Sequence, residues 1–543
     1  MKAPATRPVS SFKVLVIDDQ QQMRQIIRES LYRLGIRNVV MAGNAKEAVK
    51  AMQLENVDVV LSDYNLGEGT DGQQLLELAR STNVLNPTAP WIFITANSLR
   101  TDVLSAGDFI PDGYIVKPFT DQLLARYIET LSARKAALAP LLHAIDAKKW
   151  DEVLKVAAGF IERRDSLSVE GLKQKANAFM KLGRFDEAQA TYGQVLALNS
   201  ELPWAVLGNA NALRALGRID EARQSLEGLI ETHADYAAAY DALLEIAEEQ
   251  GDQEAALETA RAVAEVVPNA RRKFRLGAVA LDAGKADVAV KALEAAVAKN
   301  KGSVTRSHEE NVLLAQAHLD NGDAKKALAV ATDAAKQYAD HPVAQVLTKA
   351  VCAQVHQHTG NVEEAKKLMT EVERGLQVTP LPDANKLLVA KSALATGRLE
   401  LGQGLIEAVA RANTDKPLVL NAALRAAQGT PVEAACQDIV AKAGAEVQQV
   451  LQDLQAAKRN ADFVKAIELG ESALAVSPSN FHIQIELCTL YLVAIGRVAG
   501  GAEHAARAQD LLQELDSKHP NHTRVAAARK FYRERVAASG ALQ

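Results

Sequence analysis

Several short apolar stretches near the N-terminus each end on a side chain that could take part in chemistry. The stretches are 12–17, 57–62, 91–94 and 114–116, and the polar residues that follow them are Asp18 with Asp19, Asp63, Thr95 and Lys117. Short runs rich in Val, Ile and Leu indicate strands buried on both faces. In an open parallel sheet, ligands bind just beyond the carboxyl ends of the strands. We therefore expect three carboxylates, a hydroxyl and an ammonium to meet at one edge of a sheet.

The chemistry that suits this set of side chains is phosphoryl transfer. Three carboxylates placed close together repel one another, and at least one pKa would rise unless a cation joined them. Mg²⁺ prefers oxygen ligands, keeps several waters and commonly bridges carboxylates to phosphate oxygens. We expect it to be held by the side chains of Asp18, Asp19 and Asp63 and the backbone carbonyl of Asn65.

Besides binding Mg²⁺, Asp63 has the central chemical role in this interpretation. It would be the nucleophile that forms an aspartyl-phosphate. Thr95 would give a hydrogen bond, and Lys117 a positive charge, to the phosphoryl oxygens. One Asp or Lys at the end of a strand would be ordinary. Suitable residues at all of these positions, in order, favour phosphoryl chemistry over a doubly wound domain with ordinary polar strand ends.

Residues 11–135 resemble the receiver domain of two-component response regulators. The matching residues are the acidic pair Asp18 and Asp19, the phosphoacceptor Asp63, Thr95 with Ala96, Tyr114 at the aromatic switch position, and Lys117 with Pro118 and Phe119. The resemblance implies an α/β doubly wound, parallel five-stranded sheet of flavodoxin-like type, with Mg²⁺ as cofactor and a sensor histidine kinase as phosphoryl donor. One departure is the loop 64–72, which lacks the Pro that many receivers carry.

A pattern that begins with Gly and ends with Ala five residues later recurs through the middle of the chain. Its copies begin at Gly183, Gly217, Gly251, Gly284, Gly322 and Gly360. A period of about 34 residues, with Gly between two helical patterns, is typical of the tetratricopeptide array, an all-α solenoid of helix pairs. The Gly would end the first helix in a left-handed conformation, and the Ala would lie where two helices approach closely.

These patterns divide the chain into five predicted segments. They are a disordered N-terminus at 1–10, the receiver at 11–135, a helical connector at 136–167 that is broken near Pro140, tetratricopeptide repeats at 168–372, and degenerate helical hairpins at 373–543 with a C-terminal cap near 502–515. Extra residues at 300–308 separate the fourth repeat from the fifth, and a short fourth receiver helix is expected near 99–106. A stiff connector would carry a change at the last receiver helix into the array.

Four side chains could form a groove on the concave face of the array. Lys173 and Asn177 occupy two positions of the carboxylate clamp seen in some tetratricopeptide domains, and Arg271 and Arg275 occupy two more. The clamp spans adjacent repeats, whereas here one repeat too many intervenes, and Gly208 stands where an Asn is expected. The four residues predict either a groove for an acidic peptide or, as is more common for long cations, a solvated face.

The composition argues against several classes of protein. A net charge of −5 with 24% charged residues offers no basic patch for nucleic acid. No apolar run is long enough to span a membrane, and Met1–Ser11 has no apolar signal segment, so we expect a cytoplasmic protein. The three cysteines are far apart and indicate neither a zinc site nor a disulfide framework.

The sequence as a whole predicts a response regulator that accepts a phosphoryl group on Asp63 and uses its array to bind a protein. It would not be an enzyme beyond assisting its own phosphorylation and dephosphorylation. An alternative is an auxiliary receiver that inhibits, or competes for, phosphotransfer on a partner kinase. A more remote alternative is a phosphatase of the haloacid dehalogenase type, but that family needs Asp-x-Asp, and Gln20 stands where its second Asp would be.

Overall fold

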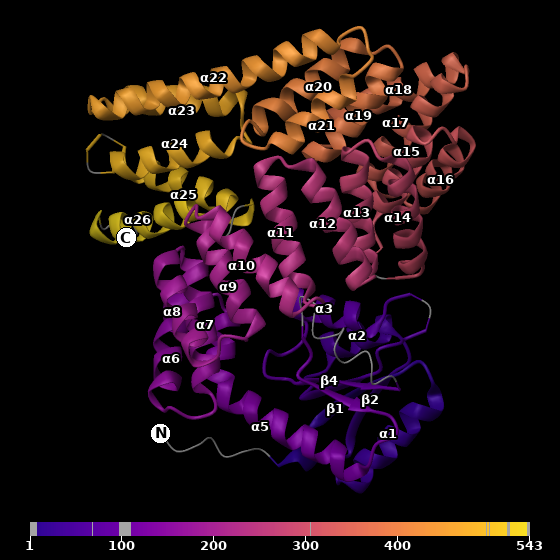
Figure 1. Ribbon diagram of the computed structural model, residues 1–543, viewed down its shortest axis with the longest axis vertical. Helices are drawn as coiled ribbons and strands as arrows, with labels where there is room; N and C mark the ends of the chain where they lie inside the picture. The colour runs from indigo at the N-terminus through magenta and orange to yellow at the C-terminus, as the bar shows by residue number, and fades with distance from the viewer. Residues whose placement is uncertain are drawn as a thin grey trace.

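The structure, a computed structural model, describes residues 8–67, 69–96, 110–303, 306–495, 497–498, 500–518 and 522–539. An α/β domain is followed by a long curved series of helix pairs (Figure 1). The predicted helix near 99–106 lies outside the described residues, as does 1–7 of the N-terminal segment. Val9–Ser11 forms a single 3-10 turn across the predicted boundary between residues 10 and 11, so Val9 and Ser10 are not disordered as predicted.

Five parallel strands form one sheet, as predicted, and their order is β2-β1-β3-β4-β5. The elements of this domain are β1 (Lys13–Ile17), α1 (Gln21–Arg33), β2 (Asn38–Ala42), α2 (Ala45–Leu54), β3 (Val59–Ser62), α3 (Gly72–Ser81), β4 (Trp91–Thr95), β5 (Gly113–Val116) and α5 (Asp121–Asp146). Ile17 lies opposite Ser62, and Thr95 opposite Val116. The residues that follow these strands therefore reach the same edge of the sheet.

Two apolar layers hold the sheet between its helices. On one face, strand residues such as Leu15 and Trp91 pack against α2 and α3. On the other face, residues such as Val16 and Ile92 pack against α1 and α5. Because both faces are covered, the strands read as continuous apolar runs in the sequence rather than as alternating ones.

The rest of the chain is helical. The helices are α6 (Trp150–Glu162), α7 (Ser168–Leu182), α8 (Phe185–Leu198), α9 (Pro203–Ala215), α10 (Ile219–Thr232), α11 (Ala237–Gln250), α12 (Gln253–Val266), α13 (Ala270–Asp282), α14 (Ala286–Lys299), α15 (His308–Asp320), α16 (Ala324–Gln337), α17 (Pro342–His358), α18 (Val362–Val378), α19 (Asp383–Ala395), α20 (Leu399–Ala412), α21 (Pro417–Ala427), α22 (Glu433–Arg459), α23 (Phe463–Val476), α24 (Phe481–Ala494), α25 (Gly501–Lys518) and α26 (Thr523–Ser539). α25 covers the residues of the predicted C-terminal cap, but α26 follows it and packs against it, so α25 is not the last helix of the array.

The turn within each repeat has the predicted backbone. The six pattern glycines, and Gly397 between α19 and α20, have φ between +69° and +83°. Side chains other than Gly rarely adopt this left-handed conformation, and the turn requires it to join two antiparallel helices.

The connector differs from its prediction in where it breaks. α5 runs through Pro140 to Asp146, and the chain turns at Lys148, whose φ is +53°. Interior proline costs a helix about 3 kcal/mol. Here Leu138 and Leu141 of α5 pack against Val153 of α6, and this burial offsets the cost.

This turn has the same form as those of the repeats. The Lys149 amide donates to the Ala144 carbonyl at 2.9 Å, just as the Arg184 amide donates to Phe179 in the first predicted repeat. The second half of α5 and α6 are therefore the first helix pair of the array. The receiver's last helix continues into that pair without a linker.

The array curves until its last helices meet its first ones (Figure 1). A Cβ placed on Gly251, at the end of α11, would lie 2.7 Å from Pro417 of α21. Arg529 of α26 donates to the Lys181 carbonyl of α7 at 2.6 Å. These contacts join parts of the chain that are far apart in sequence.

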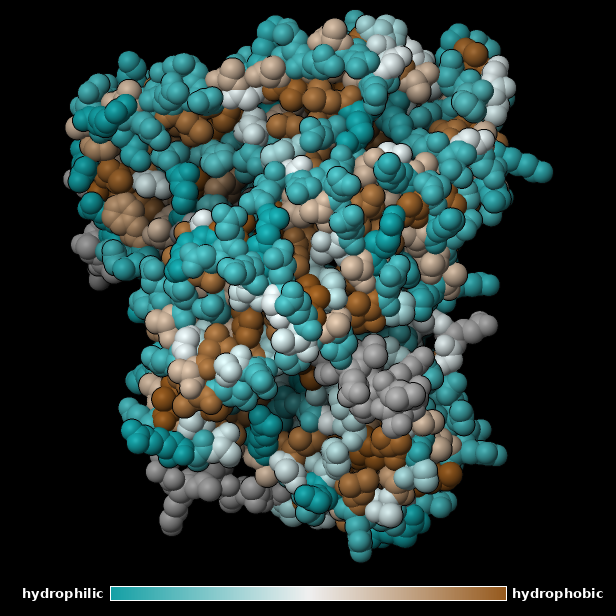
Figure 2. Space-filling view, viewed as in Figure 1, coloured by the Kyte–Doolittle hydropathy of each residue, from teal (hydrophilic) through white to brown (hydrophobic). Residues whose placement is uncertain are grey.

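None of the helices in the described part of the chain is long and apolar enough to cross a membrane. On the face shown in Figure 2, hydrophilic residues predominate over the array, and hydrophobic residues form small separate patches.

Candidate functional site

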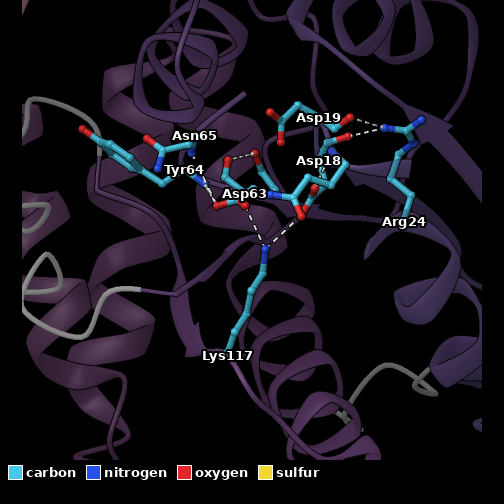
Figure 3. Close-up of polar contacts among 9 residues, drawn as sticks. Asp18, Asp19, Arg24, Asp63, Tyr64, Asn65 and Lys117 are labelled. Atoms are coloured by element: carbon cyan, nitrogen blue, oxygen red, sulfur yellow. Dashed lines mark hydrogen bonds and ion pairs between the residues drawn. The ribbon is translucent and has the colours of Figure 1, made fainter. Parts of the chain in front are cut away.

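Lys117 joins two carboxylates at the predicted edge of the sheet (Figure 3). Its Nζ lies 2.8 Å from Asp63 Oδ2 and 3.0 Å from Asp18 Oδ2. Asp63 follows β3, Asp18 follows β1 and Lys117 follows β5, so three separate strands supply the three groups. The Lys117 amide also donates to the Thr95 carbonyl at 2.8 Å, which fixes the end of β5 against the end of β4.

Backbone groups hold the two carboxylates in place. Asp63 Oδ1 accepts from the Tyr64 amide at 2.6 Å and from the Asn65 amide at 3.4 Å. Asp18 Oδ1 accepts from the Gln20 amide at 2.9 Å, just before α1 begins. Each strand therefore ends in a tight turn that points its carboxylate toward Lys117.

Burial and charge act against each other in this cluster. The Asp18 side chain is 1% exposed, and burial raises its pKa although a hydrogen bond from Lys117 opposes the rise. Burial also lowers the pKa of Lys117, but its hydrogen bonds to Asp63 and Asp18 outweigh this and leave the pKa above its usual value. The ammonium thus acts as the cation that the two carboxylates need.

The side chains at this edge present carboxylate oxygens, the type of ligand that Mg²⁺ prefers. The site has three acidic side chains, Asp18, Asp19 and Asp63, and only Lys117 among its described basic side chains contacts their carboxylates. The described residues contain no cluster of three or more His, Cys, Asp or Glu side chains preformed for a metal. Mg²⁺ does not need one, since one or two carboxylates with water and phosphate oxygens commonly bind it. A Cβ on Gly67 would lie only 3.4 Å from Asp19 Oδ2, so Asp19 faces the loop that follows Asp63.

Arg24 belongs to this site and was not expected from the sequence. Its Nη1 donates to the carbonyls of Asp18 and Asp19, at 2.5 and 3.1 Å. The guanidinium therefore fixes the backbone of the acidic pair and leaves both carboxylates free of it (Figure 3). An Arg about one helical turn after an acidic pair was the signal that could have indicated this contact.

The remaining predicted receiver residues lie around the cluster. Thr95 is 4% exposed at the end of β4, and Ala96 after it is exposed. The ring of Tyr114 packs against Phe93 with centroids 6.0 Å apart. The Tyr114 hydroxyl is buried without a hydrogen-bond partner among the described residues, and burial raises its pKa.

The four predicted groove residues lie in different surroundings from one another. Lys173 lies over the ring of Trp204, 5.3 Å from its centroid. Asn177 accepts a hydrogen bond from the buried Tyr192 hydroxyl at 2.8 Å, so its carbonyl oxygen is used inside the array.

The two arginines of this set lie on α13. Arg275 forms an ion pair with Glu248 at 2.6 Å. Arg271 is exposed at the start of the helix.

The array does line an open cavity, of about 1070 Å³, but none of these four residues lies in its walls. Its walls come mainly from α11, α13, α15, α19 and α21, and include partly buried apolar residues such as Leu281 and Leu387. Its charged walls carry more carboxylates than cations. The carboxylates are Glu245, Glu248, Glu249, Asp282, Asp320, Asp383 and Asp415, against Arg214, Lys391, Lys416 and Arg425. A cavity of this charge is poorly suited to an acidic peptide.

Comparison with known proteins identifies both parts of the chain. The family model "Response regulator receiver domain" matches residues 14–129, and two tetratricopeptide repeat models match 179–247 and 274–342. The chemotaxis protein CheY of Pseudomonas aeruginosa is 34% identical over 122 residues, which are 22% of this chain and 97% of that protein. CheY1 of Helicobacter pylori is 34% identical over 120 residues, 22% of this chain and 95% of that protein.

A solved receiver domain protein from Clostridium thermocellum is 27% identical, with a TM-score of 0.21, and covers 23% of this chain and 98% of its own. The two chemotaxis relatives and the geometry of the site both indicate a receiver domain. The cluster of Asp18, Asp63 and Lys117 at the ends of β1, β3 and β5 is the one expected from the family. This chain belongs to the response regulators by its receiver domain, to which an array of tetratricopeptide repeats is joined.

Proposed function

We propose that the chain is a phosphorylated signalling protein whose receiver accepts a phosphoryl group on Asp63 and whose array binds a protein in response. The observation that carries this proposal is the Lys117 ammonium held between Asp63 and Asp18 at 2.8 and 3.0 Å. A sensor histidine kinase would be the donor. In the transfer, the phosphorus bond to the donor breaks as a bond forms between phosphorus and a carboxylate oxygen of Asp63.

Each residue of the site has a part in that transfer. Lys117, already between the carboxylates, would move its hydrogen bond from Asp63 to a phosphoryl oxygen. Thr95, at the neighbouring strand end, would donate to a second one. Asp18, Asp19, Asp63 and the Asn65 carbonyl would hold Mg²⁺, which when bound neutralises charge that develops on the phosphoryl oxygens.

The same geometry bears on the rival functions. A haloacid-dehalogenase-type phosphatase needs an acid two residues after its nucleophile, and here Gln20 stands at that position; only its backbone amide contacts Asp18. An auxiliary receiver that acts on a partner kinase would have the same site, so it differs only in what the array binds. The protein would in either case catalyse nothing beyond its own phosphorylation and dephosphorylation.

The direct test is to incubate the protein with a small acyl phosphate and Mg²⁺ and to measure its intact mass. Addition of one phosphoryl group, lost again on standing, is the expected result. Absence of the adduct in the wild-type protein with Mg²⁺ present would overturn the proposal.

Removing the acidic pair should remove Mg²⁺ binding. In Asp18→Ala with Asp19→Ala, the net negative charge of the site falls by two, and only Asp63 remains of its carboxylates. Calorimetric titration of Mg²⁺ should show binding to the wild type and none to the double variant. Fluorescence of Trp91, which is buried in β4 beside β3, gives a second readout. A response of the double variant at the wild-type Mg²⁺ concentration would place the metal elsewhere.

A further inference from the structure

The loop that leaves the phosphoacceptor is in contact with the array. Thr70 Oγ1 lies 3.1 Å from Ser303 Oγ, and Gln74 Nε2 donates to Asn300 Oδ1 at 2.9 Å. Asn300 and Ser303 belong to the turn after α14, where extra residues separate the fourth and fifth repeats. In Figure 1 the turn between α14 and α15 lies at the end of the array that faces the receiver.

The two backbones approach so closely that a side chain would not fit between them. A Cβ placed on Gly69 would lie 2.7 Å from the Gly302 carbonyl oxygen. Gly69 has a φ of +108° and Gly302 a φ of +77°, which residues other than Gly rarely adopt. Thr70 beside them is only 4% exposed. The contact is thus a packed interface and not a chance touch of two long side chains.

A chain of hydrogen bonds links this interface to both domains. Gln74 Oε1 accepts from the Asp71 amide at 3.1 Å in the capping box at the start of α3, while its Nε2 reaches Asn300. Asn300, 5% exposed, in turn donates to Glu310 of α15 at 2.5 Å. A shift of the α3 N-terminus would therefore displace Asn300 and, through it, Glu310 of α15.

The other end of the same loop is tied to Asp63. The Gly72 amide donates to the Tyr64 carbonyl at 2.7 Å, and a Cβ on Gly72 would lie 2.4 Å from the Asp63 carbonyl oxygen. The amides of Tyr64 and Asn65 bind the Asp63 carboxylate in the unphosphorylated protein. A phosphoryl group on that carboxylate would redirect these donors, and Mg²⁺ would draw the Asn65 carbonyl. Both changes move the segment that the array holds.

We infer that the turn after α14 is a clamp on the phosphoacceptor loop, through which the array senses, and opposes, phosphorylation of Asp63. The clamp consists of Asn300, Gly302 and Ser303 on the array and Gly69, Thr70 and Gln74 on the receiver. The inference rests on the proposed function, since it gives the regulation of the same site. Coupling between two sites is reciprocal in free energy, so a clamp that phosphorylation loosens is also one that lowers the extent of phosphorylation.

Loosening the clamp from the array side should favour phosphorylation. In Asn300→Ala with Ser303→Ala, the hydrogen bonds to Gln74 and Thr70 are lost, together with the one that Asn300 donates to Glu310 within the array. The site residues Asp18, Asp63 and Lys117 are unchanged. The quantity measured is the ratio of phosphorylated to unphosphorylated protein at a limiting concentration of acyl phosphate. We expect this ratio to rise about fivefold, which is the change in an equilibrium ratio that the loss of one net hydrogen bond produces. Intact mass of the full-length chain measures this ratio.

Asn413→Ala is the matched control. Asn413 also follows the second helix of a repeat, is 4% exposed, and donates to Asp383 at 2.8 Å, but this bond and its bond to the Val409 carbonyl lie within the array. It should leave the ratio at the wild-type value. Hydrogen exchange of 64–74 and 297–303 should also rise when wild type is phosphorylated, since the contact is then weakened.

The outcomes separate the two proposals. No adduct in wild type, clamp variant or control would overturn the proposed function. An adduct in all three, with equal ratios and with unchanged exchange in both segments, would overturn the clamp and leave the proposed function standing.

Discussion

Asp63→Asn is expected to abolish phosphorylation of this chain by an acyl phosphate while leaving the fold intact. An amide has nearly the shape of a carboxylate but is not a nucleophile toward phosphorus. The repulsion between Asp63 and Asp18 is removed together with the attraction of Asp63 for Lys117, so the midpoint of thermal unfolding should change little. Intact mass after incubation with an acyl phosphate and Mg²⁺ measures the first effect, and circular dichroism the second.

Asp58→Asn is the control for this variant, because Asp58 lies at the opposite end of β3. Its Oδ2 accepts from the Lys13 amide at 2.8 Å, far along the strand from the cluster. This variant should be phosphorylated as the wild type is. A phosphorylated species of Asp63→Asn, with the adduct mapped to any other residue, would show that Asp63 is not the acceptor.

Gly208→Asn is expected to destabilise the array by about 1–3 kcal/mol, the usual cost of overpacking. A Cβ on Gly208 would lie 2.3 Å from the ring of Tyr192 in the preceding helix. Tyr192 is 3% exposed and its hydroxyl is bound to Asn177, so the ring has little room to move. The midpoint of urea denaturation, followed by circular dichroism, should fall.

Gly193→Asn makes the same change within α8, the helix that precedes α9, where a Cβ would meet nothing within 4 Å. Asn is a slightly better helix former than Gly, so this variant should be at least as stable as the wild type. Equal stability of the two variants would mean that Tyr192 does not need the space at Gly208.

The packing around Gly208 also explains why the pattern of the carboxylate clamp is incomplete in the repeats. An Asn was expected at the position of Gly208, next to Asn177 in the pattern. Tyr192 fills the space instead, and its hydroxyl donates to Asn177, so an Asn side chain would not fit at this position. Residue types at groove positions do not disclose this, because the neighbour that fills the position comes from another helix.

The sequence by itself determined the receiver and the period of the repeats. Each strand is a continuous apolar run that stops at a polar residue, and the parallel order of strands brings those residues to one edge whatever the loops do. Each repeat turn needs a left-handed residue, and Gly marks it at regular intervals. Requirements of this kind are local, so they determine residue type and spacing along the chain. The positions of Asp18, Asp63 and Lys117 could therefore be predicted from the sequence.

Only the tertiary structure decided how these parts meet. Pro140 indicated a break in the connector, but packing of α5 against α6 outweighs its local cost, and the turn falls at Lys148, a residue with no turn signal. The apposition of Gly69 and Gly302 depends on the accumulated curvature of the repeats between α5 and α14. The small rotations between successive helix pairs add up over the array, and the total cannot be predicted from any single residue. For this physical reason, the receiver chemistry could be read from the sequence, while its contact with the array could not.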